Sequence, residues 1–494
     1  MSVRKSAKYI FIGNIISRTI TVVGSIFLAR ILFPEDYGYL LMAAIFSSFI
    51  QLFGNMGFEY YYLQSKPKSE EEERKILNIT YKLRVFTNGG LFLFQIVISY
   101  LAQWYYDAQI VGEMLRIYAI SIPIAALTQV DIFILRKKLD YRPETIANIS
   151  KDIFDVSFKI LFALMGLGAL SFAYASVIAS IVKLLVMRRF VRFKPNLFEK
   201  DREIYNRIFF FGKHFMIAGI SGFASRYIDK FILTTTYSPE LIGGYSFSYN
   251  QSDNIKAKTT RPFGSLIISY IAKHKGNKNR ILEKISFMTF FEIAFLAPVY
   301  IFLIANINEI IRILFTEKWL FTAPLFQIFL LAELIKLPNA LSINLLTGLG
   351  HPEILSKISI FNVLAMTLFL VLIVWLSNNI YFYAIVFSTI GTINAYIKSL
   401  YGLKKLGYTY IEFAKHSKLI HHLGYIFIYT GAILLIRYFF KDNFIMTDTI
   451  IFILLFITIN YFFDSRNFYK SVEIIFGEKH IVSITYKKYK KGIL

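Results

Sequence analysis

Charged side chains lie inside several strongly apolar segments of the chain, where an ionisable group is expensive. Arg18 lies in an apolar run near the N-terminus, and Arg226, Asp229 and Lys230 would share one face of a later helix. The segment 249–261 is polar throughout, although it falls within a longer candidate span; it is expected to line an aqueous cavity, and the alternative is a long loop in place of that span. An ionisable group at the centre of a bilayer costs about 2.5–3.5 kcal/mol on insertion scales. Each of these groups must therefore pair with another charge or line a water-filled cavity.

Carboxylates in the same segments are candidates for accepting a proton or another cation. Lys151, Asp155 and Lys159 recur every four residues, so they would form one partly self-neutralised stripe on a helix. The candidate acceptors for ion coupling are Asp155, Asp229, Glu292 and Glu333. The sequence does not choose among them, and the alternative is that these charges form structural ion pairs.

Composition identifies the class of protein that must position these groups. Of the 494 residues, 56% are apolar and 18% are charged, and the mean hydropathy is +0.52. These values exclude a disordered chain or an ordinary soluble enzyme and predict an integral membrane protein.

The chain has no cysteine, which excludes disulfides and thiolate metal sites, and its seven histidines are scattered, so no metal is expected. It has no glycine-rich phosphate loop of the ATPase type and no catalytic constellation, so we expect a non-enzyme without a cofactor. Its energy source would be a proton or sodium gradient or the consumption of the substrate outside the cell.

The length of a bilayer-crossing helix divides the chain into fourteen candidate spans. They cover residues 9–31, 40–63, 85–103, 114–135, 144–165, 169–187, 208–233, 244–272, 284–305, 322–347, 354–376, 380–400, 419–438 and 446–463. With the N-terminus inside, the cytoplasmic segments carry 36 Lys and Arg and the external turns carry four. The positive-inside rule therefore predicts that both termini are cytoplasmic. It also accounts for the net charge of +23 without nucleic-acid binding.

The two halves of the chain contain similar motifs in the same order. Pro34-Glu35 and Pro239-Glu240 follow the first and seventh spans, and related Pro-containing motifs recur at offsets of 215 and 209 residues. The repeat predicts an all-α membrane protein with two pseudo-symmetric six-helix lobes, a cavity between them and two C-terminal helices. The predicted divisions are 1–190 (N-terminal lobe), 191–207 (cytoplasmic linker), 208–405 (C-terminal lobe), 406–465 (helix pair) and 466–494 (basic cytoplasmic tail).

Three motifs resemble signatures of a known family. The stretch from Ala29 to Gly38 (ARILFPEDYG) is similar to the signature after the first helix of Wzx-type polysaccharide flippases, which belong to the multidrug/oligosaccharidyl-lipid/polysaccharide exporter (MOP) superfamily. The segment from Gln51 to Gln64 continues the likeness, and Phe315 to Trp319 resembles a further marker. The resemblance implies a rocker-switch transporter in the bacterial cytoplasmic membrane that moves an undecaprenyl-pyrophosphate-linked oligosaccharide to the outer leaflet. It also implies contact with membrane lipid, and a glycan polymerase and a chain-length regulator as partners. Nucleic-acid binding is not expected, because no basic stripe is interleaved with exposed aromatic residues.

The substrate that this resemblance implies gives the polar residues specific roles. A pyrophosphate cannot cross a low-dielectric layer unaccompanied, so cations must replace its water shell. Arginine suits this role, because its fork holds two phosphate oxygens and keeps its proton. The predicted substrate-binding residues are the cations Arg18, Arg226, Arg261, Lys256 and Lys258, with Tyr249, Asn250 and Gln251 against sugar hydroxyls.

Three alternative functions remain open at this point. A multidrug or small-cation exporter of the same superfamily would need an acidic lining, whereas the eighth span is mainly basic. A murein-precursor flippase has the same helix count, but the motifs after the first two spans look polysaccharide-type. A membrane enzyme of glycan assembly would need a large external loop, and no loop between the spans exceeds roughly thirty residues.

Overall fold

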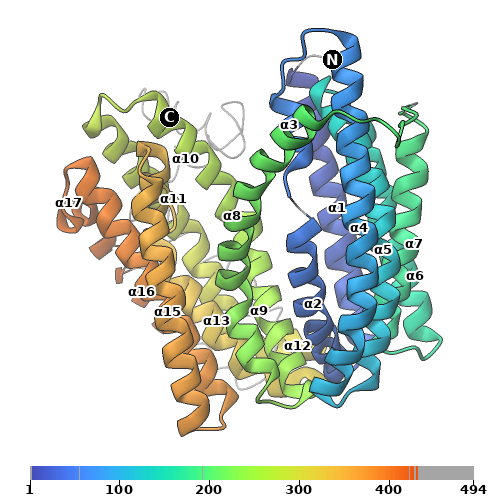
Figure 1. Cartoon of the computed structure of the whole chain (residues 1–494). Coiled ribbons are helices and arrows are strands. Elements are labelled where there is room, and N and C mark those ends of the chain that lie inside the picture. The colour runs from blue at the N-terminus through green and yellow to red at the C-terminus, as the bar shows by residue number, and fades with distance from the viewer. Residues whose placement is uncertain are drawn as a thin grey trace, which may run out of the picture. The chain divides into compact units, whose positions relative to one another are not determined.

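The computed structural model describes residues 3–431, except for 55, 192, 422, 425, 428 and 429, and these residues form helices without any strand. Figure 1 shows their order along the chain. The first part contains α1 (Val3–Ile31), α2 (Pro34–Gly54), α3 (Phe58–Gln64), α4 (Glu70–Tyr106), α5 (Gln109–Lys137), α6 (Arg142–Leu164), α7 (Leu170–Arg188) and α8 (Arg202–Thr234).

The second part begins with α9 (Pro239–Thr259), α10 (Arg261–Lys273), α11 (Lys278–Ala305) and α12 (Ile307–Leu314). It continues with the 3-10 helix η1 (Glu317–Thr322), α13 (Ala323–Lys336), the 3-10 turns η2 (Leu337–Asn339) and η3 (Ser342–Asn344), and α14 (Leu345–Leu349). The last described helices are α15 (Pro352–Leu376), α16 (Ile380–Leu406) and α17 (Tyr410–His416).

Among the described residues, nine helices are long and apolar enough to cross a membrane. This confirms the predicted all-α membrane fold, while the count of fourteen spans stays a prediction. The candidate span 446–463 and the end of 419–438 lie outside the described residues.

The helix boundaries differ from the predicted spans where the backbone cannot continue as an α-helix. The predicted span 40–63 is interrupted before α3, where Gly57 has a φ of 72°. The predicted span 244–272 divides at Thr260 into α9 and α10, because the proline at position 262 lacks the amide hydrogen that an interior helical residue donates. The predicted span 322–347 ends its regular helix at Lys336, before Pro338. Hydropathy alone does not register these interruptions.

The chain divides into two compact units. The N-terminal unit comprises Met1–Phe247, Leu314–Trp319 and Val374–Ile380. The C-terminal unit comprises Ser248–Ile313, Leu320–Ile373 and the chain from Tyr381 onward. The boundary at 247/248 falls within α9.

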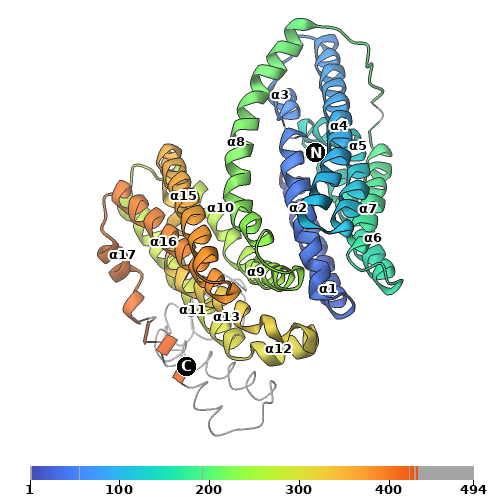
Figure 2. The same cartoon turned by 60° about the horizontal axis from the view of Figure 1, so that its bottom comes forward.

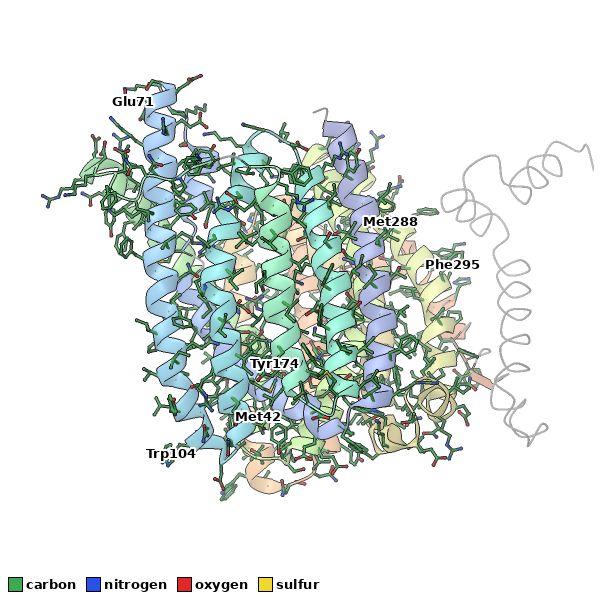
Figure 3. All side chains as sticks on the ribbon, turned by 90° about the vertical axis from the view of Figure 1, so that its right-hand side faces the viewer. Met42, Glu71, Trp104, Tyr174, Met288 and Phe295 are labelled. Atoms are coloured by element: carbon green, nitrogen blue, oxygen red, sulfur yellow. The ribbon has the colours of Figure 1, made fainter. Side chains whose placement is uncertain are left out.

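Long helices pack side by side in the N-terminal unit. α6 packs against α7 and α1, and α5 packs against α4 and α7, as Figure 2 shows. α2 contacts α4, α5 and α8. Glu71 and Trp104 lie at opposite ends of α4 (Figure 3). The four glutamates at the start of α4 follow the N-cap residue Ser69, whose side chain accepts a hydrogen bond from the Glu72 amide, and acidic groups stabilise a helix N-terminus.

In the C-terminal unit, α11 forms the centre of a second cluster of helices. It packs against α13, η2 and α17, and α10 packs against α14. The buried apolar residues here include Ile267 and Ile271 of α10, Ile285 of α11 and Phe413 of α17. This packing brings α9, α10, α13 and α16 around a common cavity, described below.

The two Pro-Glu motifs of the sequence repeat contact each other within the N-terminal unit. A Cβ atom added to Gly38 of α2 would collide with the carbonyl of Pro239, and one added to Gly243 of α9 would collide with the carbonyl of Pro34. The contact is therefore reciprocal, since each helix places a glycine against the first residue of the other. Glycine is required at both positions by close backbone approach.

Trp319, from the third family-like motif, packs beside the contact between α2 and α9. Its side chain is fully buried and its ring centroid lies 5.2 Å from that of Tyr37 and 4.2 Å from that of Phe247. Its indole N–H donates to the carbonyl of Ala29 at 2.8 Å. A hydrogen-bonded tryptophan thus joins residues about 290 positions apart.

The close approach of α2 and α9 predicts an effect on stability. Replacing Gly38 with alanine should destabilise the protein by about 1–3 kcal/mol, because the added methyl group meets backbone that cannot rotate away. Thermal unfolding of the purified protein in detergent measures the effect. Gly90→Ala in α4 is the control, because nothing lies within 4 Å of a Cβ at that position and alanine has the higher helix propensity. Equal melting temperatures for the two variants would contradict the packing.

Candidate functional site

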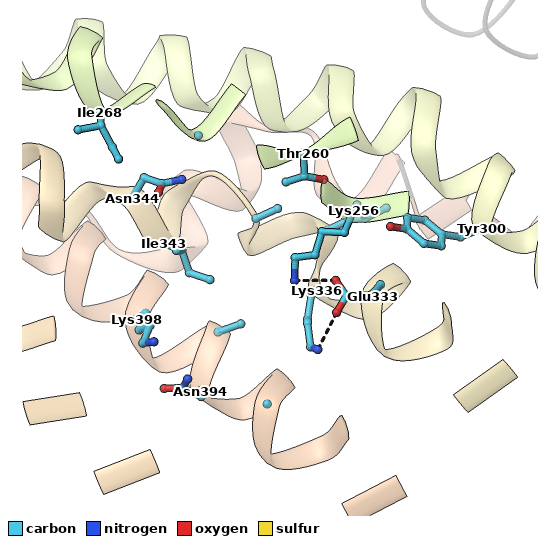
Figure 4. A pocket seen from close by; sticks show the side chains of 15 residues that line it. Lys256, Thr260, Ile268, Tyr300, Glu333, Lys336, Ile343, Asn344, Asn394 and Lys398 are labelled. Atoms are coloured by element: carbon cyan, nitrogen blue, oxygen red, sulfur yellow. Dashed lines mark hydrogen bonds and ion pairs between the residues drawn. The ribbon is translucent and has the colours of Figure 1, made fainter. Parts of the chain in front are cut away.

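The C-terminal unit contains a cavity of about 440 Å³, lined by α9, α10, α13 and α16, of which α13 and α16 lie in candidate membrane spans. Figure 4 shows its charged and amide side chains converging from α9, α13 and α16 and from the 3-10 turn η3. The lining residues are Lys256, Thr260, Gly264, Ile268, Tyr300, Glu333, Lys336, Leu337, Ala340, Ile343, Asn344, Gly391, Asn394, Ala395 and Lys398. The volume lies within the range of small-molecule sites in proteins.

A carboxylate bridges two ammonium groups in this cavity. Glu333 accepts from Lys256 Nζ at 2.8 Å and from Lys336 Nζ at 3.0 Å. Glu333 and Lys336 are three residues apart on α13, so they lie on the same helical face, whereas Lys256 comes from α9. The side chains of Glu333 and Lys336 are 15% and 17% exposed. The bridge joins α9 to α13 and balances part of the charge.

Two further carboxyl groups act on this bridge without lining the cavity. Glu292 of α11 is buried and faces the Thr260 hydroxyl and Lys256. Asp253 lies one turn before Lys256 on α9 and is close enough to act on the charge of Lys336. The two lysines of the bridge are therefore largely compensated by acidic groups.

Lys398 is different from the other two lysines. It is half-buried on α16, and within the part of the chain that the structure describes no carboxylate forms an ion pair with it or acts on its charge. Asn394 lies one turn before Lys398, and its buried Oδ1 has no hydrogen-bond partner among the described residues. An ammonium group and a nearby amide facing a cavity can bind an anion, with lysine acting as a point charge.

The N-terminal unit contains a second cavity, of about 500 Å³. Its lining is mainly hydroxyl, amide and small apolar groups of α2, α4, α5 and α7: Ala44, Ser47, Ser48, Ile50, Gln51, Gly54, Arg84, Asn88, Leu91, Tyr118, Ser121, Ile122, Ala125, Ala126, Gln129, Ser176 and Ser180. The one ionisable cation in this lining, Arg84, is 2.6 Å from Glu59 of α3, and the two side chains are 6% and 3% exposed. The guanidinium of Arg84 also donates to the carbonyl of Gly54.

The structure brings together two of the residues predicted from sequence. Lys256, a predicted substrate ligand, and Glu333, a predicted ion acceptor, form the ion pair in the C-terminal cavity. Arg18 and Arg226 are exposed on α1 and α8 and line neither of the two cavities. The guanidinium of Arg226 donates to the carbonyl of Gly222 at 3.0 Å. The predicted vestibule between the lobes stays a prediction for these two arginines.

The remaining predicted ligands have varied surroundings. Tyr249 packs edge-on against Phe329 and Phe387, with ring centroids 5.4 and 5.6 Å apart. Asn250 is exposed, and Gln251 Oε1 accepts from the Asn254 amide at 3.5 Å. The side chains of Arg261 and Lys258 lie outside the described residues. The ligand role of all five stays a prediction.

Two of the predicted ion acceptors form ion pairs with neighbouring lysines on the same helix. Asp155 accepts from Lys159 Nζ at 2.5 Å on α6. Asp229, which is buried on α8, is 3.4 Å from Lys230 Nζ. These contacts match the structural alternative considered for the sequence, and neither aspartate lines the C-terminal cavity.

Sequence reasoning missed Lys398, Asn394 and the pair of Glu59 and Arg84. Arg84 lies just before the predicted span 85–103 and Lys398 lies at the end of the predicted span 380–400, but α4 begins at Glu70 and α16 continues to Leu406. Both residues therefore lie well inside helices. Asn394 lies four residues before Lys398, so the two share a helical face. This spacing is the sequence pattern that could have indicated a polar site on this helix.

The all-α fold, with its long apolar helices and polar cavities, defines a multi-pass membrane protein. A solved structure of the lipid II flippase MurJ in an inward closed conformation has a TM-score of 0.71 to this chain, at 15% identity, and the match covers 92% of this chain and 98% of that one. At this identity the likeness shows the fold alone.

Sequence comparisons identify the family. A family model described as polysaccharide biosynthesis protein matches residues 27–324, more than half of the chain. The chain therefore belongs to this family, and the predicted resemblance to the Wzx-type polysaccharide flippases of the MOP superfamily is confirmed.

Two relatives of known sequence match about two thirds of this chain. The succinoglycan biosynthesis transport protein ExoT of Rhizobium meliloti is 20% identical over 66% of this chain and 65% of its own length. An uncharacterized membrane protein in the cps region of Klebsiella pneumoniae is 20% identical over 67% of this chain and 68% of its own length. The match thus spans just under two thirds of the succinoglycan transport protein.

The ion bridge in the C-terminal cavity predicts a specific stability effect. Glu333→Gln should destabilise the protein by about 1–3 kcal/mol, because it removes the shared charge partner of two partly buried ammonium groups. Adding Lys336→Met removes one of those surplus charges, so the double variant should recover part of the lost melting temperature. A double-mutant cycle by thermal unfolding measures the coupling. Additive losses would contradict the bridge.

Proposed function

We propose that this protein is a flippase for an undecaprenyl-pyrophosphate-linked oligosaccharide. It moves the lipid-linked unit from the inner to the outer leaflet of the bacterial cytoplasmic membrane by alternating access, during assembly of a surface polysaccharide. Membership of the polysaccharide biosynthesis family supports the glycan part of this proposal. The single observation that carries the anionic part is that Lys398 lines the C-terminal cavity and has no acidic partner among the described residues.

The physical reason is the cost of moving a phosphate group through low dielectric. An isolated ion in such a medium loses a large hydration energy, so a pathway must supply opposite charge. Lys398 would supply that charge, with Asn344 and Asn394 donating to phosphate oxygens. The bridge of Lys256, Glu333 and Lys336 would hold α9 against α13 and fix one wall of the cavity.

Other parts of the proposal rest on sequence. The excess of Lys and Arg in alternate loops supports cytoplasmic termini and insertion in the cytoplasmic membrane. A proton or sodium gradient would drive transport, with Glu292 and Glu333 as acceptors nearest the cavity. The sugar chain would pass from this protein to a glycan polymerase and its chain-length regulator. We propose a transporter rather than an enzyme.

The positive charge of Lys398 in the C-terminal cavity gives a test of whether the transported substrate is anionic. Lys398→Ala should reduce surface polysaccharide at least tenfold, and Lys398→Glu should abolish it, because each removes the uncompensated cation. The measurement is the amount of surface glycan at matched membrane abundance of the protein. Lys404→Ala is the control, because Lys404 is exposed near the end of the same helix and does not line the cavity.

The same variants separate this function from the alternatives. Undiminished surface glycan with Lys398→Glu would contradict the proposal. A gain in efflux of a cationic dye by Lys398→Glu, with glycan unchanged, would favour a multidrug exporter. Complementation of a strain depleted of its murein-precursor flippase would favour the murein-precursor alternative.

A further inference from the structure

The cavity of the N-terminal unit is not used by the anionic site proposed above, and its lining has a different chemistry. We propose that this cavity binds the uncharged sugar portion of the lipid-linked substrate, a neutral polyhydroxyl ligand. The inference rests on the proposed function for the identity of the cargo, and it assigns the glycan its own subsite. The argument uses the charge, the hydrogen-bonding groups and the apolar surface of the lining.

The charge of the described lining is balanced. Arg84 is paired with Glu59 at 2.6 Å, and its guanidinium also donates to the Gly54 carbonyl. An anionic headgroup would find no uncompensated cation in the lining, and a cationic drug would find no uncompensated carboxylate. A neutral ligand is the class that this balance favours.

The hydrogen-bonding groups of the lining suit hydroxyl groups. Five serines and the amides of Gln51, Asn88 and Gln129 face the cavity. An amide offers donors and an acceptor together, and a hydroxyl offers both in one atom, so adjacent sugar hydroxyls can be satisfied in either direction. This density of uncharged polar groups within membrane-spanning helices requires water or a polar ligand as partner.

Several of these groups have no protein partner. Among the described residues, no hydrogen bond involves the side-chain amides of Gln51 or Gln129, and the buried Ser121 Oγ has no partner. Other lining groups are already engaged: Ser48 Oγ is 2.8 Å from the Tyr227 hydroxyl, and Asn88 donates to the Arg84 carbonyl at 2.9 Å. The unpartnered amides come from α2 and α5, so they present hydrogen-bonding capacity from two walls.

The apolar part of the lining suits the remaining surface of a sugar ring. Tyr118, Ile122 and Leu91 line the cavity beside the amides. A sugar ring has C–H faces as well as hydroxyl edges, and a tyrosine offers a flat apolar body with a polar tip. A wholly apolar occupant, such as a lipid tail, would leave the amides unsatisfied at a cost of about 1–3 kcal/mol each. The volume of about 500 Å³ is in the range of ligand sites.

The test compares binding of two lipids that differ only in the sugar. Full-length protein in lipid nanodiscs is titrated with undecaprenyl pyrophosphate and with the undecaprenyl-pyrophosphate-linked oligosaccharide of the host. The variant is Gln51→Leu combined with Gln129→Leu, which nearly conserves volume and removes the amides. Gln109→Leu is the control, because Gln109 is exposed at the start of α5 and donates to Glu113 away from the cavity.

We expect the double variant to bind the oligosaccharide-bearing lipid at least tenfold more weakly and the bare lipid unchanged, with the control unchanged for both. Equal binding by wild type and double variant, or an equal loss for both lipids, would overturn the sugar subsite. Should the double variant fail to fold, Gln129→Leu alone replaces it, with at least a threefold loss expected for the oligosaccharide-bearing lipid and none for the bare lipid; an unchanged affinity for the former overturns the proposal.

A third probe keeps this inference separable from the proposed function. The oligosaccharide released from its lipid tests the cavity without any pyrophosphate. If wild-type protein binds neither lipid but binds the free oligosaccharide, and the double variant loses that binding, the sugar subsite stands and the flippase proposal fails. If Lys398→Glu weakens both lipids while the glutamine variants weaken neither, the flippase proposal stands and the sugar subsite fails.

Discussion

The ion bridge of Glu333 with Lys256 and Lys336 is the interaction on which the C-terminal site depends. A charged side chain inside a membrane protein persists only where another charge, a polar group or water compensates it. Glu333 compensates two lysines from different helices at 2.8 and 3.0 Å. Because the acidic groups are used on this bridge, Lys398 remains as the lining cation without an acidic partner among the described residues. The bridge therefore neutralises part of the charge of the lining, and the charge that is left, on Lys398, is positive.

The cavities of the two units differ in the charge of the side chains that line them. In the C-terminal unit the lining includes three lysines and one glutamate. In the N-terminal unit Arg84 and Glu59 neutralise each other in an ion pair, and the rest of the lining is uncharged. The substrate proposed for this protein has a charged pyrophosphate and a neutral sugar chain, and each of these two parts would suit one of the two linings. Each cavity is formed within one unit, so its chemistry does not depend on the other.

Much of the fold follows from elementary sequence patterns. Long apolar runs predicted membrane-spanning helices, and motifs such as that around Pro34 predicted both the family and a repeat. The structure adds that Gly38 and Gly243 allow the repeated motifs to meet at backbone distance. The interruption at Gly57 was not predicted, because one glycine changes mean hydropathy very little while it changes the backbone.

The site was less predictable than the fold. Lys256 and Glu333 were selected from sequence as charges in costly places, and they do form a pair in a cavity. Their pairing could not be predicted, because they are 77 positions apart in the sequence and belong to different helices. Lys398 was missed because positive residues near a span end are usually assigned to the cytoplasmic surface, and only the observed length of α16 places it inside.

The most direct measurement of the central claim is a structure of the full-length protein with bound undecaprenyl pyrophosphate. The account predicts that phosphate oxygens lie within ion-pair distance of the Lys398 ammonium group, with the bridge of Lys256, Glu333 and Lys336 intact. A structure in which the lipid is bound with its phosphates elsewhere, and the cavity beside Lys398 holds only water, would contradict it.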